Sequence, residues 1–142
     1  MNIAMELDNF EVNNIYFDKP LNNTVIKNSL FFRIIYSNTF FSTTGAHLHF
    51  KIKSSDKKRD NYNILSNLEK NKVVVSTLAE IEKQILARFS AKGKTPVFKI
   101  WHKLHFGHIK LLTDRYVVKI SGIWETDTEY GITHRFITAS NV

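Results

Sequence analysis

The stretch KISGIWETDTEYGITHRF, residues 119–136, contains two runs with the composition of β-strands and three carboxylates between them. Both runs are rich in Ile, Thr and aromatic residues, which favour strands, and Gly131 begins the second run. Glu125, Asp127 and Glu129 alternate, so they would point the same way on an extended chain. Two interpretations are open: a solvent-exposed hairpin tip, or an acidic cluster that holds Mg²⁺ for hydrolysis.

We favour the hairpin tip, because the three acids are close neighbours in the sequence. A hydrolytic metal site usually gathers its ligands from separate elements and places a base or a lysine over them. The nearest lysine, Lys119, belongs to the preceding run and has no specific nuclease spacing. Acids at the tip would repel phosphate, so we expect a nucleic acid to avoid this end of the hairpin.

The composition indicates one globular domain that comprises residues 1–142. The chain is 43% hydrophobic and contains no cysteine, which excludes disulfides, thiolate zinc sites and cysteine nucleophiles. No apolar run approaches the roughly 20 residues of a membrane span. The N-terminus lacks the basic and then apolar pattern of a signal peptide. We therefore expect an intracellular protein that does not use a membrane.

The formal charge of +7 is concentrated in one segment of the chain. Residues 88–119 contain eight Lys and Arg side chains against a single acid, Asp114. A localised basic surface favours a polyanionic partner, and we expect nucleic acid.

The order of the expected elements predicts a mainly β, α+β fold with one central helix. Strands are expected over residues 10–17, 29–37 and 46–53, then a helix over 76–90, then strands over 97–104, 115–124 and 131–138. A helix after the third strand is typical of the oligonucleotide-binding (OB) fold. We predict an OB-like antiparallel barrel of five to six strands, with a general α+β sandwich as the alternative.

The strand expected over residues 97–104 would carry Lys99, Trp101 and Lys103 on one face. Cations that neutralise phosphates, beside a ring that stacks bases, are what sequence-tolerant single-strand binding requires. We expect phosphate contacts from Lys99, Lys103, Lys110, Lys119, Arg33, Lys51 and Lys53, with His49 beside them, and base stacking from Trp101, Tyr116, Phe106 and Phe31. The alternatives are that the lysines only confer solubility, that Trp101 is buried, and that Tyr116 alternates inward.

The sequence His47-Leu48-His49 supports an enzymatic alternative. It resembles the His-hydrophobe-His metal motif of rolling-circle replication nucleases, in which a tyrosine attacks the DNA phosphodiester. Tyr116 and Lys119 resemble the Tyr-x-x-Lys of that family, which carries its tyrosine on a helix, whereas Tyr116 lies in an expected strand. We therefore expect no metal, no cofactor and no catalytic residue, and we keep the metal-dependent nuclease as the alternative.

Three further histidines, His102, His105 and His108, are spaced by three. This spacing would align them on a helix, but Gly107 and the strand-like run before them argue against a helix. We expect these three to be surface histidines that add to the basic surface formed by residues 88–119.

The runs LFFRIIYS (30–37) and YVVKISGIWETDTEYGITHRF (116–136), with a helix and a basic strand between them, resemble OB-fold single-stranded-DNA-binding proteins of large DNA viruses. The resemblance lies in the order of the elements and in the residue composition of the strands over residues 29–138. It implies a protein of viral genome replication or repair that coats single-stranded DNA or RNA, and it allows a homo-oligomer. A structural or assembly protein with a basic surface is a further alternative.

Overall fold

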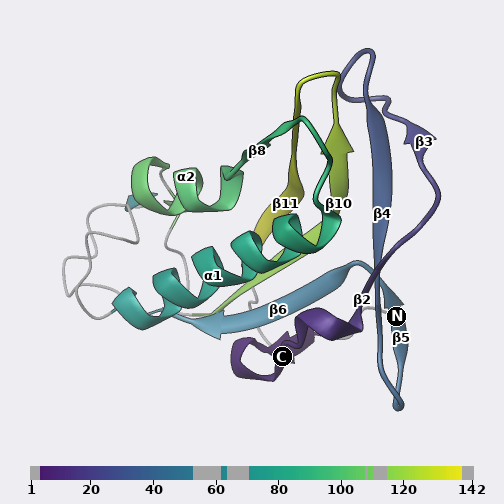
Figure 1. Cartoon of the computed structure of the whole chain (residues 1–142). Coiled ribbons are helices and arrows are strands. Elements are labelled where there is room, and N and C mark those ends of the chain that lie inside the picture. Colours follow the sequence, from purple (N-terminus) through teal and green to yellow (C-terminus); the bar gives the residue numbers. More distant parts are fainter. Residues whose placement is uncertain (1–3, 53–61, 64–70, 108, 111–114, 139–142) are drawn as a thin grey trace.

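The computed structural model describes residues 4–52, 62–63, 71–107, 109–110 and 115–138 (Figure 1). Its centre is a hairpin of two long strands, β10 (Arg115–Glu125) and β11 (Glu129–Thr138). On its other side, β10 pairs first with β6 (Ala46–Lys51) and then with β4 (Leu30–Ser37). One strand therefore joins the two halves of the sheet.

A β-bulge between Ile120 and Gly122 marks the point where β10 changes partners. An extra residue bends a strand and shifts the alternation of its side chains, so Ile120 and Ile123 are both fully buried. Gly122 is required here, because a Cβ at this position would overlap the carbonyl oxygen of Phe32 on β4. The close approach of β4 and β10 thus depends on this glycine.

The main sheet is mixed. Along the order β1 (Ala4–Glu6), β6, β10, β11 and β8 (Thr95–Val97), the two outermost pairs are parallel and the inner pairs are antiparallel. β4 also pairs with β2 (Ile15–Phe17), β3 (Leu21–Asn22) and β5 (Ser42–Thr44). A separate pair joins β7 (Tyr62–Asn63) to β9 (Ile109–Lys110). Short 3-10 turns, η1 (Leu7–Asn9) and η2 (Val12–Asn14), connect β1 to β2.

The prediction of an OB-like barrel is wrong. In the described part of the chain, nine strands form an open sheet with parallel and antiparallel pairs, and α1 (Lys72–Phe89) follows β7 rather than the third strand. The fold is α+β, with a second helix, α2 (Lys99–Phe106), where the sequence predicted a strand. The runs at 29–37, 46–53, 115–124 and 131–138 do form strands, but their pairing is set by contacts that composition does not reveal.

The core lies between α1 and one face of the sheet, and Figure 1 shows α1 running across that face with α2 beside it. The helix contributes Leu78, Ile81 and Ile85, each at most 5% exposed. At its C-terminal end, Phe89 makes edge or tilted ring contacts with Phe17, Phe32 and Tyr130. Neither helix of the described residues is long and apolar enough to cross a membrane.

Candidate nucleic-acid interface

The face of the sheet opposite α1, which we call the outer face, gathers basic side chains. Residues that lie opposite one another on paired strands share a face, and Lys51 lies opposite Arg115, while Lys119 lies between His47 and Arg135. Beyond the bulge, Gly122 lies opposite Arg33 of β4. The outer face therefore carries Arg33, Lys51, Arg115, Lys119 and Arg135, of which Lys119 is half-buried and the others are exposed.

The two histidines of β6 also face outward, but neither is presented to a ligand. Burial lowers the pKa of His47, and the nearby charge of Lys119 lowers this pKa further. His47 is 4% exposed, and neither of its ring nitrogens has a hydrogen-bond partner among the described residues. The Nδ1 of His49 lies 2.9 Å from the Oε1 of Glu6. His49 is thus held by a carboxylate rather than presented to a ligand.

The nuclease alternative requires Tyr116 and the two histidines to act on one phosphodiester. Tyr116 is 2% exposed and stacks on Phe50, with 6.1 Å between the ring centroids. Since Phe50 alternates with His49 along β6, the sheet lies between the tyrosine and both histidines. The described residues contain no group of three potential metal ligands. The same burial contradicts the prediction that Tyr116 stacks bases.

The segment predicted as a strand over 97–104 is mostly the helix α2. Lys99 and Lys103 lie one helical turn apart, and Trp101 lies on a different side of the helix with His105. Trp101 is 41% exposed and stacks on His105 with ring centroids 4.4 Å apart; Phe106 is 60% exposed. Trp101 and Phe106 are therefore accessible to bases, although they lie on a helix rather than on the predicted strand.

A buried carboxylate fixes the start of α2. Glu82 of α1 is 0% exposed and accepts hydrogen bonds from the backbone N–H groups of Ile100 (2.7 Å) and Trp101 (2.8 Å). The N–H groups of a first helical turn have no acceptor within the helix, so Glu82 supplies one. Burial raises the pKa of Glu82, whereas these two bonds act to lower it. The position of Trp101 thus depends on a residue of the other helix.

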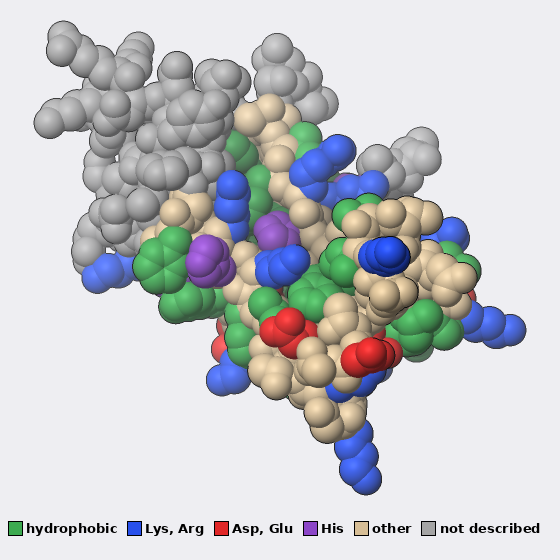
Figure 2. All heavy atoms as spheres, turned by 90° about the horizontal axis from the view of Figure 1, so that it is seen from above, with side chains coloured by type: hydrophobic (Ala, Val, Ile, Leu, Met, Phe, Trp, Pro, Cys, Tyr) green, Lys and Arg blue, Asp and Glu red, His purple; other side chains and the backbone are tan. Residues whose placement is uncertain are grey.

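Lys99 lies where α2 meets the central hairpin. Its Nζ is 4.7 Å from the ring centroid of Trp124, a cation–π distance. Trp124 is 5% exposed, and its ring covers Gly131, where a Cβ would lie 2.6 Å from the ring. Figure 2 shows basic, histidine and hydrophobic side chains lying close together on this side of the molecule, with acidic side chains next to them.

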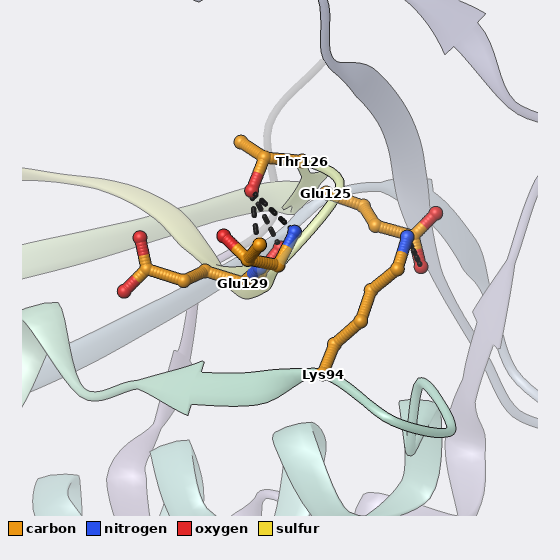
Figure 3. Close-up of polar contacts among 5 residues, drawn as sticks. Lys94, Glu125, Thr126 and Glu129 are labelled. Carbon is orange, nitrogen blue, oxygen red and sulfur yellow. Dashed lines mark hydrogen bonds and ion pairs between the residues drawn. The ribbon is translucent and has the colours of Figure 1, made fainter.

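The three acids of the opening stretch lie at the tip of the β10–β11 hairpin, which confirms the prediction of a turn, and Figure 3 shows two of them, Glu125 and Glu129. The N–H of Thr126 donates to the carbonyl of Glu129 at 2.8 Å, and the Oγ1 of Thr126 accepts from the N–H of Glu129 at 3.0 Å. Glu125 forms an ion pair with Lys94 at 3.4 Å, and Asp127 is exposed. The turn is thus held by Thr126 and by backbone groups, and the acids form no metal site among the described residues.

The remaining predicted residues are scattered. Phe31 is half-buried on β4, opposite Trp124. Lys53 and His108 lie outside the described residues, and for Lys110 only its place in β9 is described. His102 and His105 both lie on α2, so the prediction against a helix there is wrong. The sequence reasoning missed Arg115 and Arg135, although both follow the alternation of their strands.

Comparison of the chain with protein-family models, with curated proteins and with solved structures finds no match in any of the three. The function is therefore inferred from the chain's own residues.

Proposed function

We propose that the protein binds single-stranded nucleic acid with little preference for sequence. The observation that supports this most strongly is the gathering of five Lys and Arg side chains on the outer face. Backbone phosphates carry the same charge at every nucleotide, so a row of cations attracts the strand whatever its bases. The exposed rings of Trp101 and Phe106 favour a single strand, because its bases are free to stack on aromatic side chains.

The spacing of the cations supports an extended ligand. From Arg115 to Gly122, which lies beside Arg33, β10 runs for seven residue steps, or about 23 Å at the usual rise of a strand. A length of this order accommodates several phosphates in a row. The biological role that the sequence resemblance implies, the coating of single strands inside the cell during viral genome replication or repair, belongs to the same proposal.

Salt dependence tests the proposal directly. Five phosphate contacts predict a slope of log affinity against log salt of about −3.5, which is about a 100-fold loss of affinity between 50 and 200 mM salt. We would measure fluorescence anisotropy of labelled oligo-dT, and of a duplex of equal length, across this range. Absence of binding to oligo-dT at low salt would overturn the proposal.

Two double variants assign the binding to the outer face. Replacement of Arg33 and Arg135 by Gln should reduce the magnitude of the salt slope by about 1.4, because two phosphate contacts are lost. Replacement of Lys19 and Lys27 by Gln is the matched control, since both are exposed cations in the connections before and after β3. Equal effects of the two pairs would show that binding depends on net charge alone.

A structural or assembly role uses the same cations against an acidic protein partner. It predicts no stacking contribution, so the affinity for oligo-dT would equal the affinity for a base-free chain of the same length. The proposed single-strand binding predicts that oligo-dT binds more tightly than the base-free chain, because each stacked base contributes about 1–3 kcal/mol.

A further inference from the structure

Two hollows lie on different sides of α2. One, of about 980 Å³, lies between α1 and α2, and the other, of about 690 Å³, lies between α2 and β11. Phe98 and Trp101 line both hollows. The two aromatic side chains therefore form a ridge with a concave surface on each side.

The hollow between the helices is mainly apolar. Beside the two rings it is lined by Val73, Val75 and Ala79 of α1. Val73 is 77% exposed and Phe98 is 39% exposed, so a large hydrophobic surface faces solvent. Lys72, Lys83 and Glu80 also line it. A flat, weakly polar ring such as a nucleobase fits this lining, which also contains the stacked rings of Trp101 and His105.

The hollow between α2 and β11, which we call the basic hollow, is also mainly apolar but brings two lysines and two histidines together. Lys99, His102 and Lys103 line it from the helix, and His134 lines it from β11, with Glu129 as the acidic side chain of the lining. Burial, helped by the positive charges of Lys103 and Lys99 and opposed by a backbone hydrogen bond with Ile132, lowers the pKa of His134 to about 4. The ammonium groups of Lys99 and Lys103 attract an anion to this hollow.

We infer that a bound single strand crosses α2, with a base in the apolar hollow against Trp101 and a neighbouring phosphate in the basic hollow against Lys99 and Lys103. This inference rests on the proposed function and gives it a nucleotide-binding site. Each hollow is lined by two lysines and one glutamate, so cations lie on both sides of the ridge formed by Phe98 and Trp101. A helix with its side chains is about 10 Å across, so one or two nucleotides are enough to reach from one hollow to the other.

Bound phosphate has a measurable consequence at His134. An anion beside the imidazole favours its protonated form, so the pKa of His134 should rise from about 4 when phosphate binds. Because the bound state then holds the proton more tightly, affinity should increase as the pH falls through the bound-state pKa. The titratable groups that line this hollow with His134 are Lys99, His102 and Lys103 of α2 and Glu129 on its own strand.

Two probes separate the hollows in the 142-residue chain: a short oligo-dT and a base-free oligonucleotide of the same length. Oligo-dT should quench the fluorescence of Trp101 and raise the pKa of His134. This pKa is measured by NMR, and the His134→Gln variant identifies the signal of His134. The base-free chain should raise the pKa of His134 without quenching. The Trp101→Phe variant identifies the quenched ring, since the second tryptophan, Trp124, is 5% exposed.

Affinities complete the test. Trp101→Ala should weaken oligo-dT about 10-fold or more and leave the base-free chain unchanged, whereas Lys103→Gln should weaken both. Phe40→Ala and Lys27→Gln are the matched controls, because Phe40 is 90% exposed at the turn between β4 and β5, and Lys27 is exposed before β4. Neither control should change either affinity.

The outcomes distinguish the inference from the function on which it rests. If oligo-dT binds while the Trp101 fluorescence and the His134 pKa stay unchanged, the strand does not cross α2 and only the inference is wrong. If the base-free chain quenches Trp101 as oligo-dT does, the apolar hollow does not hold a base. If oligo-dT does not bind at low salt, the proposed function itself is wrong.

Discussion

Replacement of Glu82 tests whether one buried carboxylate holds α2 in place. In the Glu82→Ala variant, two backbone N–H groups of the first turn of α2, those of Ile100 and Trp101, lose their acceptor. A buried donor without a partner costs about 1–3 kcal/mol, so the pair costs about 2–6 kcal/mol. Removal of a buried charge offsets part of this cost. We therefore expect the free energy of unfolding to fall by about 2–4 kcal/mol.

Urea unfolding followed by circular dichroism measures this change, and Glu80→Ala is the matched control. Glu80 is exposed and lies two positions earlier on the same helix, so its replacement should change the free energy of unfolding by less than about 0.5 kcal/mol. A cost below about 1 kcal/mol for Glu82→Ala would refute the view that this carboxylate anchors α2.

The pH dependence gives a second, independent readout of the same residue. Burial raises the pKa of Glu82 in the folded chain, so the folded state binds a proton more tightly than the unfolded state. The resulting stability is fully present below the unfolded pKa and is lost as the pH rises through the folded pKa. The Glu82→Gln variant lacks this titration. The stability of the wild-type chain relative to the variant should therefore decrease from acid to neutral pH, and an increase would contradict this assignment.

Two further variants test the central hairpin. Gly122→Ala places a Cβ against the carbonyl oxygen of Phe32 and the ring of Phe31. Like other overpacking substitutions, it should lower the free energy of unfolding by about 1–3 kcal/mol, measured by urea titration. An unchanged midpoint would show that β4 and β10 can separate without cost. Thr126→Ala removes the side-chain acceptor of the turn N–H groups of Thr128 and Glu129 and should cost about 1 kcal/mol. Its affinity for oligo-dT should stay that of the wild type, because we expect the strand to avoid the hairpin tip.

The strands that could be predicted are those whose composition alone favours an extended chain. β4, β6, β10 and β11 all begin and end close to the predicted positions, because their alternating β-branched and aromatic residues lie within each run. Their partners could not be predicted. The change of partner along β10 depends on the bulge before Gly122 and on the absence of a Cβ there, which are contacts between residues distant in sequence.

The segment 97–104 shows why a short apolar run is ambiguous. Phe98, Ile100 and Leu104 share one face of a strand, and Ile100 and Leu104 also lie one turn apart on a helix. In the structure these last two are 1% and 0% exposed, so the helical period is the correct one. The acceptor for the first turn of this helix comes from Glu82 on α1, which no local pattern of residues 97–104 reveals.

The candidate site could also be predicted only in part, because the sequence shows the alternation of a strand but not its pairing. Arg33, Lys51 and Lys119 were predicted as outward cations, and the strand register places them on one face together with Arg115 and Arg135. The prediction for Tyr116 failed because its strand allows two alternations, and only the pairing with Phe50 decides between them. The sequence gives the period of a strand but not which of its two sides faces the core.

Lys99 of α2 lies close to a tryptophan of the outer face. Trp124 lies opposite Phe31 on β4 and packs over Gly131, so its ring belongs to the outer face, and the ammonium group of Lys99 lies 4.7 Å from the centre of that ring. Lys99 also lines the basic hollow beside β11. A strand that follows the cations of β10 toward the hairpin therefore meets Lys99 before it meets the acids of the tip. The exposed Asp127 repels phosphate at the tip, whereas Lys99 and Lys103 attract it in the hollow beside α2, which Glu129 also lines. The acids at the hairpin tip therefore mark one end of the surface on which we expect the nucleic acid to bind.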